Sequence, residues 1–149
     1  MKKVENNNFD NTIKKMENED LLNKLLFTGK TSKKVVIADL EFELQTLTEK
    51  DSRDVFAVLL SFSDEKRLPI IKGVTLAKSI SSINGVNFSQ FAKELLEKEG
   101  SKVDDLAIAN KKNEVVLMMQ TSITSKLFEE YEELSREAKD SISVEKIKN

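Results

Sequence analysis

The stretch KVVIADLEFELQTLTEKD (residues 34–51) contains the change of period that decides the fold. In its first part, apolar residues alternate with acidic or polar ones, which is the pattern of a half-buried strand. These apolar residues are Leu40, Phe42 and Leu44. A β-branched run at 35–37 precedes them, and Ala38-Asp39 suits a tight turn. The pattern predicts either a small β-hairpin or one kinked strand at 35–46, which must pack on helices or on a neighbouring chain.

A helical period begins directly after this strand region. Thr48 and Asp51 have the spacing of a capping box, in which each side chain accepts from the other residue's backbone N–H. The apolar residues that follow at helical spacing are Val55, Phe56, Leu59, Leu60 and Phe62. We interpret Phe56 and Phe62, like Phe42, as core residues.

Three further helices are predicted along the rest of the chain. The first covers 70–83, with Asn84-Gly85 as its C-terminal stop. A short one covers 88–96 and ends before Gly100. The third covers 116–138 as one continuous helix, because apolar residues recur there every three or four positions. Most of the chain is therefore expected to be helical.

The N-terminal region gives a weaker helical pattern. Leucines at Leu21, Leu22, Leu25 and Leu26 share a face of a helix from Asn18 to Phe27, with Asn18 as N-cap and Gly29 as stop. An upstream extension is left open by Phe9, Ile13 and Met16. We expect residues 1–17 to be a flexible segment, 18–140 a single domain and 141–149 a flexible tail. The predicted fold class is mainly α-helical α+β, with several amphipathic helices and one small hairpin or kinked strand.

The composition excludes several kinds of site and partner. The 149 residues contain no Cys, His or Trp, so there is no disulfide framework, no thiolate or imidazole metal site and no Cys-His or Ser-His pair. Lys and Arg number 24 and Asp and Glu 26, and this balance argues against a nucleic-acid partner. No apolar run approaches the ~20 residues that cross a bilayer, so no membrane partner is expected.

Residues that could support catalysis lack the required surroundings. The segment Gly29-Lys30-Thr31 looks like the end of a phosphate-binding loop, but Lys24 occupies the position of that motif's first glycine. Paired acids such as Glu129-Glu130 are expected on a solvated helix face. Ser79 beside Lys78 has no glycine-rich oxyanion loop nearby. We expect no catalytic site, no cofactor and no metal, and hence no enzyme.

Gly73 is the one glycine inside a predicted helix. It either allows close approach of a neighbouring backbone or is tolerated at a cost of about 1 kcal/mol. Met118 and Met119 point about 100° apart on a helix, so at least one of them is expected to face a partner groove.

Four segments together resemble the small tail proteins of tailed bacteriophages. They are LLFTGK (25–30), VIADLEFELQTLT (36–48), TLAKSISSING (75–85) and the acidic helix with Leu127, Tyr131 and Leu134. In that family a short strand or hairpin leads into an L-T-x-x-[DE] helix start. A T-L-A-x-S-I-x-x-I-N-G block and an L-x-x-x-Y-x-x-L segment follow in the same order.

The resemblance implies a baseplate-hub or tail-tip component, or a tail assembly chaperone. Either would be a non-enzymatic protein that acts through protein–protein contacts, in the virion tail or in the host cytoplasm during assembly. Its partners would be other tail or baseplate proteins, or further copies of itself in a homo-oligomer. The expected packing or contact residues are Phe42, Leu44, Ile80, Ile83, Leu127 and Tyr131. The alternative is a small cytoplasmic adaptor or regulatory protein that binds one partner.

Overall fold

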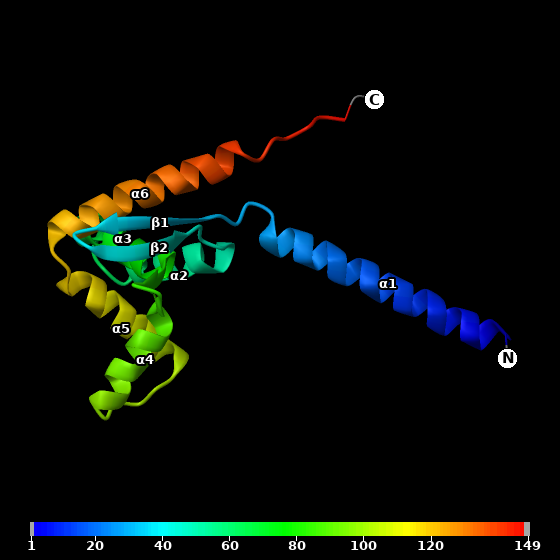
Figure 1. Cartoon of the computed structure of the whole chain (residues 1–149), viewed down its shortest axis with the longest axis horizontal. Helices are drawn as coiled ribbons and strands as arrows, with labels where there is room; N and C mark the ends of the chain where they lie inside the picture. The colour runs from blue at the N-terminus through cyan, green and yellow to red at the C-terminus, as the bar shows by residue number, and fades with distance from the viewer. Residues whose placement is uncertain (1, 148–149) are drawn as a thin grey trace. The chain divides into compact units, whose positions relative to one another are not determined.

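The computed structural model describes residues 2–147, with side chains at 14, 15 and 17–147 (Figure 1). Within this range the chain forms six helices and four strands, which confirms the predicted mainly helical α+β fold. The chain divides into two compact units between Lys30 and Thr31, rather than after residue 17. The outermost residues of the two predicted flexible ends, 1 and 148–149, lie outside the described part, and the flexibility of those ends stays a prediction.

The first unit consists of helix α1 (Lys2–Phe27) and the turn that follows it. The prediction that Asn18 caps the helix is wrong, because Asn18 lies well inside α1. The upstream extension that the sequence left open is thus present, although the side chains of Phe9, Ile13 and Met16 lie outside the described residues. Gly29, the predicted stop, follows the helix with a φ of +82°, a conformation that glycine adopts without strain.

The second unit begins with a β-hairpin of β1 (Ser32–Ile37) and β2 (Leu40–Gln45). Ala38 and Asp39 form its two-residue turn with φ values of +51° and +65°. Positive φ at both central positions is typical of the tight turn that matches the twist of a hairpin. The hairpin alternative is therefore confirmed over the kinked strand.

A second hairpin completes the sheet. It consists of β3 (Ile80–Ile83) and β4 (Val86–Asn87), and the antiparallel strand order is β1-β2-β3-β4. The predicted helix at 70–83 is wrong for its last four residues, since α3 (Asp64–Ser79) ends before them. Pairing of β3 with β2 outweighs the helical spacing of the two isoleucines. Asn84-Gly85 forms the hairpin turn instead of a helix stop.

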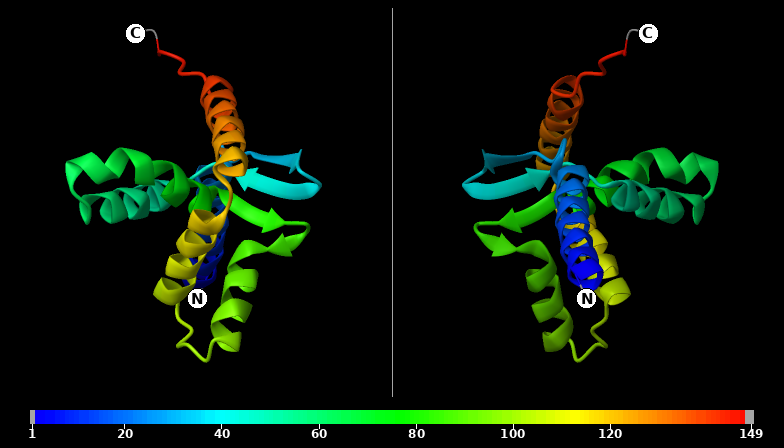
Figure 2. Two further views of the ribbon diagram at one scale, coloured as in Figure 1. Left: turned by 90° about the vertical axis from the view of Figure 1, so that its left-hand side faces the viewer. Right: turned by 90° about the vertical axis from the view of Figure 1, so that its right-hand side faces the viewer.

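Between the two hairpins lies a pair of helices, α2 (Glu49–Leu60) and α3, that pack against each other. Figure 2 shows this pair at one end of the strands and the two hairpin turns at the opposite end. The predicted capping box is confirmed: the backbone N–H of Asp51 donates to Thr48 Oγ1, and that of Thr48 to Asp51 Oδ2, each at 3.1 Å. The prediction that Phe56 and Phe62 are core residues is wrong, because both are exposed.

Three helices follow β4: α4 (Phe88–Lys98), α5 (Asp105–Met118) and α6 (Thr121–Asp140). The short helix before Gly100 is confirmed. The prediction of one continuous helix at 116–138 is wrong, because the backbone is extended at Met119 (ψ 152°). No glycine or proline marks this break. It follows from packing, since α5 lies against α3 and α4 whereas α6 lies against α3 and the first hairpin.

The main core lies where both β2 and β3 meet the helices of the second unit. Every element from β2 onward except α2 and β4 contributes to it, and its fully buried large side chains are Phe42, Leu44, Leu76, Ile80, Phe88, Val116 and Leu127. A smaller cluster of Val55, Leu59 and Val74 holds α2 on α3. The α2–α3 pair thus has a core of its own and leaves much of its apolar surface uncovered.

Candidate functional site

The six residues expected to pack in the core or to contact a partner fall into two groups by their exposure. Phe42, Leu44, Ile80 and Leu127 are at most 1% exposed, so they are core residues of the folded chain. Ile83 and Tyr131 are half-buried and pack against the same core. Of the six, only Ile83 and Tyr131 therefore keep surface that a partner could contact, and a larger accessible surface lies elsewhere.

Such a surface is an apolar groove between α2, α3 and α5, with a volume of about 740 Å³. Its apolar lining comes from all three helices and the turn after α2: Val58, Phe62, Ile70, Val74 and Leu117. Its polar side chains are Ser61, just after α2, and Asn110 and Asn113 of α5. This α2–α3–α5 groove has no charged residue in its lining, which suits an apolar side chain or helix face rather than an ionic ligand.

Gly73 of α3 lies in the lining of this groove. A Cβ atom built there would lie 3.8 Å from Val116 Cγ1 and 3.9 Å from Leu117 Cδ2, which are ordinary van der Waals distances. The first of the two explanations left open for Gly73, a close backbone approach, is therefore not needed. The missing side chain leaves the groove deeper, at a cost in helix propensity of about 1 kcal/mol.

Exposed apolar side chains continue beyond the groove on the same helices. On α2 and α3 they are Phe56, Leu60, Leu68 and Ile71. On α5, Met118 is exposed next to Leu117, while Met119 packs on the main core. Met118 is therefore the accessible one of the two methionines, and the expectation that it faces a partner groove stays a prediction. Large contiguous apolar patches on a soluble protein mark surfaces that bind another protein or a membrane.

Helix α1 carries another concentration of exposed apolar residues. Leu21, Leu22, Leu25 and Leu26 are 53–70% exposed, and their spacing places them on one side of the helix. We call these four residues the α1 leucine face. Asp20 and Lys24 form an ion pair of 3.6 Å along α1. The face was visible in the sequence as a periodic pattern, but its exposure was not.

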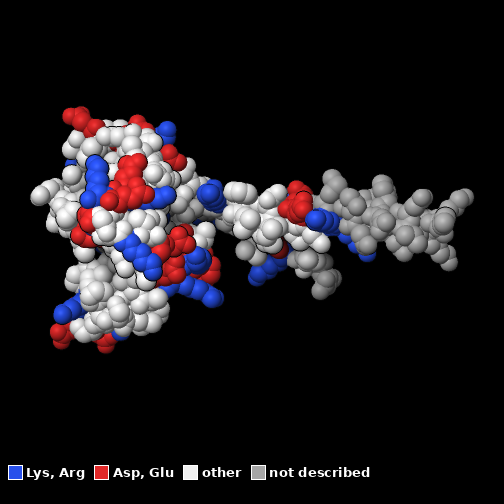
Figure 3. Space-filling view, turned by 90° about the horizontal axis from the view of Figure 1, so that it is seen from below, with Lys and Arg blue, Asp and Glu red and all other residues white. Residues whose placement is uncertain are grey.

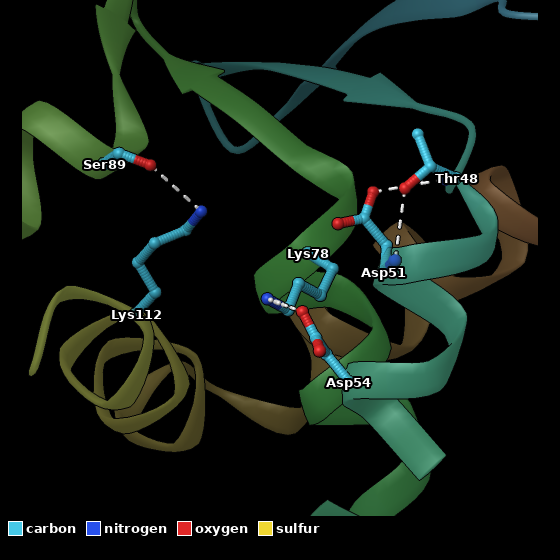
Figure 4. A network of polar contacts seen from close by, with 6 residues as sticks. All are labelled: Thr48, Asp51, Asp54, Lys78, Ser89 and Lys112. Carbon is cyan, nitrogen blue, oxygen red and sulfur yellow. Dashed lines mark hydrogen bonds and ion pairs between the residues drawn. The ribbon is translucent and has the colours of Figure 1, made fainter. Parts of the chain in front are cut away.

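A polar network lies near the start of α4, as Figure 4 shows. Lys112 of α5 donates to Ser89 Oγ at 3.2 Å, and its ammonium lies 5.4 Å from the centre of the Phe88 ring. Lys78 of α3 pairs with Asp54 of α2 at 3.2 Å. Burial, and then the nearby positive charge of Lys78, lower the pKa of Lys112. The two lysines line a hollow of about 220 Å³, and both have a partner, so the network links helices rather than presenting an unpaired reactive group.

Other ion pairs link α6 to the sheet and α4 to α5. Lys33 of β1 contacts Glu130 of α6 at 2.6 Å and Glu133 at 3.5 Å. The Glu130 carboxylate raises the pKa of Lys33. Glu130, expected on a solvated face, is thus part of a β1–α6 link that no spacing in the sequence indicated. Lys111 of α5 likewise bonds Glu99, just after α4, at 2.8 Å.

The rest of the described surface carries both signs of charge. Figure 3 shows acidic and basic side chains interspersed on one face of the second unit. Among the residues whose side chains the structure describes, no group of three or more acidic residues is placed to hold a metal ion. Within residues 2–147, no helix is both long and apolar enough to cross a bilayer. No protein-family model matches this chain, and no curated protein or solved structure matches it either.

Proposed function

We propose that this chain is a structural or assembly protein of a bacteriophage tail or baseplate, and that it acts through protein–protein contacts and not through catalysis. The observation that carries the proposal is the uncharged α2–α3–α5 groove, whose three helices carry further exposed apolar residues. The assignment to a bacteriophage tail rests on the order of the four sequence segments that resemble small tail proteins.

The groove has the properties of a helix acceptor. Amphipathic helices commonly bind by placing apolar side chains three or four residues apart into such a groove. Burying one leucine or phenylalanine contributes roughly 1.5–3 kcal/mol, so two or three inserted side chains would outweigh the cost of ordering the partner. The exposed Phe56, Leu60 and Met118 around the groove would extend this contact.

The partners would be other tail or baseplate proteins. A baseplate component would remain in the virion, whereas an assembly chaperone would act in the host cytoplasm and be absent from finished particles. Immunodetection of the chain in purified virions separates these two versions. Both versions use the same groove.

The test uses two matched leucines of α5. Leu117 lines the groove and is 73% exposed, and Leu106 is 71% exposed but lies outside the groove lining. We expect the purified wild-type chain to bind a purified product of a reading frame adjacent to its own. Leu117→Gln should weaken that binding at least about tenfold through lost apolar burial, and Leu106→Gln should leave it unchanged. Both variants should keep the wild-type circular dichroism.

Two outcomes would contradict the proposal. One is that no product of the neighbouring frames binds, which would favour the adaptor alternative. The other is binding that Leu106→Gln and Leu117→Gln weaken equally, because the contact would then not depend on the groove.

A further inference from the structure

The α1 leucine face belongs to a unit that cannot bury it internally. The described part of this unit is one helix and the turn that follows, so the four leucines have no second element of their own unit to pack on. An isolated helix gains most of its stability in proteins from packing its apolar face. The leucine face therefore requires a partner surface outside its unit.

The α2–α3–α5 groove matches this face in character and in length. Leu21 to Leu26 span about 8 Å along a helix axis at 1.5 Å per residue. The groove runs about 10 Å along α5, from Asn110 to Leu117, by the same rise. The face is convex and apolar, and the groove is hollow and lined mainly by apolar side chains.

We propose that the groove accepts the α1 leucine face of a second copy of this chain, with each copy giving its α1 to the other in a symmetrical dimer. The proposal rests on the docking function proposed above and names its first partner. A stable interface buries roughly 1,200–2,000 Å² in total, which is large for one short helix face. A reciprocal exchange provides two such contacts for one dimer, and a two-fold pair of this kind is the commonest form of oligomer.

The first test is sedimentation velocity over a range of concentrations, using the full chain. Wild type should be a dimer. Leu22→Gln/Leu25→Gln, which alters the leucine face, and Leu117→Gln, which alters the groove, should each weaken dimerisation at least about tenfold. All of these positions are exposed, so the fold should be retained, and circular dichroism checks this. Leu106→Gln is the matched control and should remain a wild-type dimer.

The second test mixes the two kinds of variant. Leu22→Gln/Leu25→Gln retains an intact groove, and Leu117→Gln retains an intact leucine face. Their mixture retains one intact contact, whereas each variant alone retains none. The mixture should therefore form a 1:1 heterodimer that is weaker than the wild-type dimer, at concentrations where each variant alone is monomeric. A dimer made by two α1 helices packing on each other would behave differently, because Leu117→Gln alone would still dimerise.

Three results would overturn the proposal: a monomeric wild type at all concentrations, a groove variant that dimerises normally, or no heterodimer in the mixture. These failures are separable from failure of the docking function. A monomeric wild type that binds a tail protein through Leu117 would leave that function intact and remove only the self-exchange. A wild-type dimer that binds no tail protein would leave the self-exchange intact and remove the docking function.

Discussion

Helices α6 and α1 both carry leucines at helical spacing, but the leucines of α6 are buried and those of α1 are exposed. Leu127 and Leu134 of α6 are buried against the sheet and α3. The α1 leucine face is more than half exposed. The difference shows that an apolar helix face indicates a need for a partner, while the identity of that partner depends on what the rest of the chain supplies. In α6 the partner is the core of the same unit, and for α1 we propose that it is another chain.

The largest expected difference in the free energy of unfolding is between substitutions of two phenylalanines, Phe42 and Phe56, that were both predicted to be core residues. Phe42→Ala should lower the free energy of unfolding by about 3–5 kcal/mol, because it removes a ring from the centre of the main core. Phe56→Ala should change it by about 0.5 kcal/mol or less, since the ring is 62% exposed. Denaturant unfolding followed by circular dichroism measures both. Equal losses would mean that Phe56 is buried in the isolated chain.

The same contrast can be made between the two helices. Leu127→Ala should cost about 2–5 kcal/mol, the usual range for a fully buried leucine. Leu25→Ala in α1 should leave the free energy of unfolding within about 0.5 kcal/mol of wild type at concentrations where the chain is monomeric. A large loss for Leu25→Ala under those conditions would show that α1 packs on its own chain.

The sequence predicted best where a local rule and the tertiary structure agree. The alternation of Leu40, Phe42 and Leu44 predicted β2, and the Thr48/Asp51 spacing predicted the start of α2. In both cases the pattern specifies the backbone geometry directly: a period of two requires an extended chain, and the two side chains satisfy the free N–H groups of the first turn.

Predictions failed where distant contacts decide between two local possibilities. Ile80 to Ile83 fit either a helix or a strand, and pairing with β2 selects the strand. Asn-Gly at 84–85 suits both a helix stop and a hairpin turn, and the pairing of β3 with β4 selects the turn. The break at Met119 has no breaker residue. It follows from packing, because α5 and α6 share α3 but α5 also packs on α4 and α6 on the first hairpin.

The candidate site could not be located by pattern alone. Periodicity identifies Phe56, Phe62 and Leu117 as apolar but does not tell whether the chain covers them. The groove depends on how three helices pack, and Gly73 contributes to it by lacking a side chain. The residues chosen from the sequence were mostly core residues for the same reason: the strongest apolar patterns mark the surfaces that the chain buries itself.

Two glycine substitutions, one in the groove and one in a hairpin turn, should have smaller effects of opposite sign on the free energy of unfolding. Gly73→Ala should raise the free energy of unfolding by up to about 1 kcal/mol, because alanine favours the helix and its Cβ meets only ordinary contacts. Gly85→Ala should lower it by about 1–2 kcal/mol, because φ is +78° in that turn. Thermal or denaturant unfolding measures both. A destabilised Gly73→Ala would mean that the packing of α3 on α5 does require glycine.

The smallest effects are two pH dependences of opposite sign. The Glu130 carboxylate raises the pKa of Lys33 above its usual 10.5. The stabilisation from this pair is therefore full below pH 10.5 and lost as the pH rises through the folded-state pKa. Burial lowers the pKa of Lys112 below 10.5, so its destabilising charge is lost as the pH rises toward 10.5.

Unfolding of Lys33→Gln and Lys112→Gln over pH 7–11 tests these signs. The stability lost in Lys33→Gln should shrink toward high pH. The free energy of unfolding of Lys112→Gln, relative to that of wild type, should fall as the pH rises. The reason is that Lys112 in wild type loses its buried charge and wild type becomes more stable. Parallel pH profiles for the two variants would contradict the assigned causes.

The most direct test of the central claim is hydrogen–deuterium exchange of the α1 amides as a function of protein concentration. If the leucine face docks on another chain, exchange near residues 21–26 should be fast in dilute protein and slow at high concentration. Leu117→Gln, which changes no residue of α1, should shift this protection to higher concentration. Protection of α1 that is equal at every concentration, or absent even when the protein is concentrated, would contradict the account.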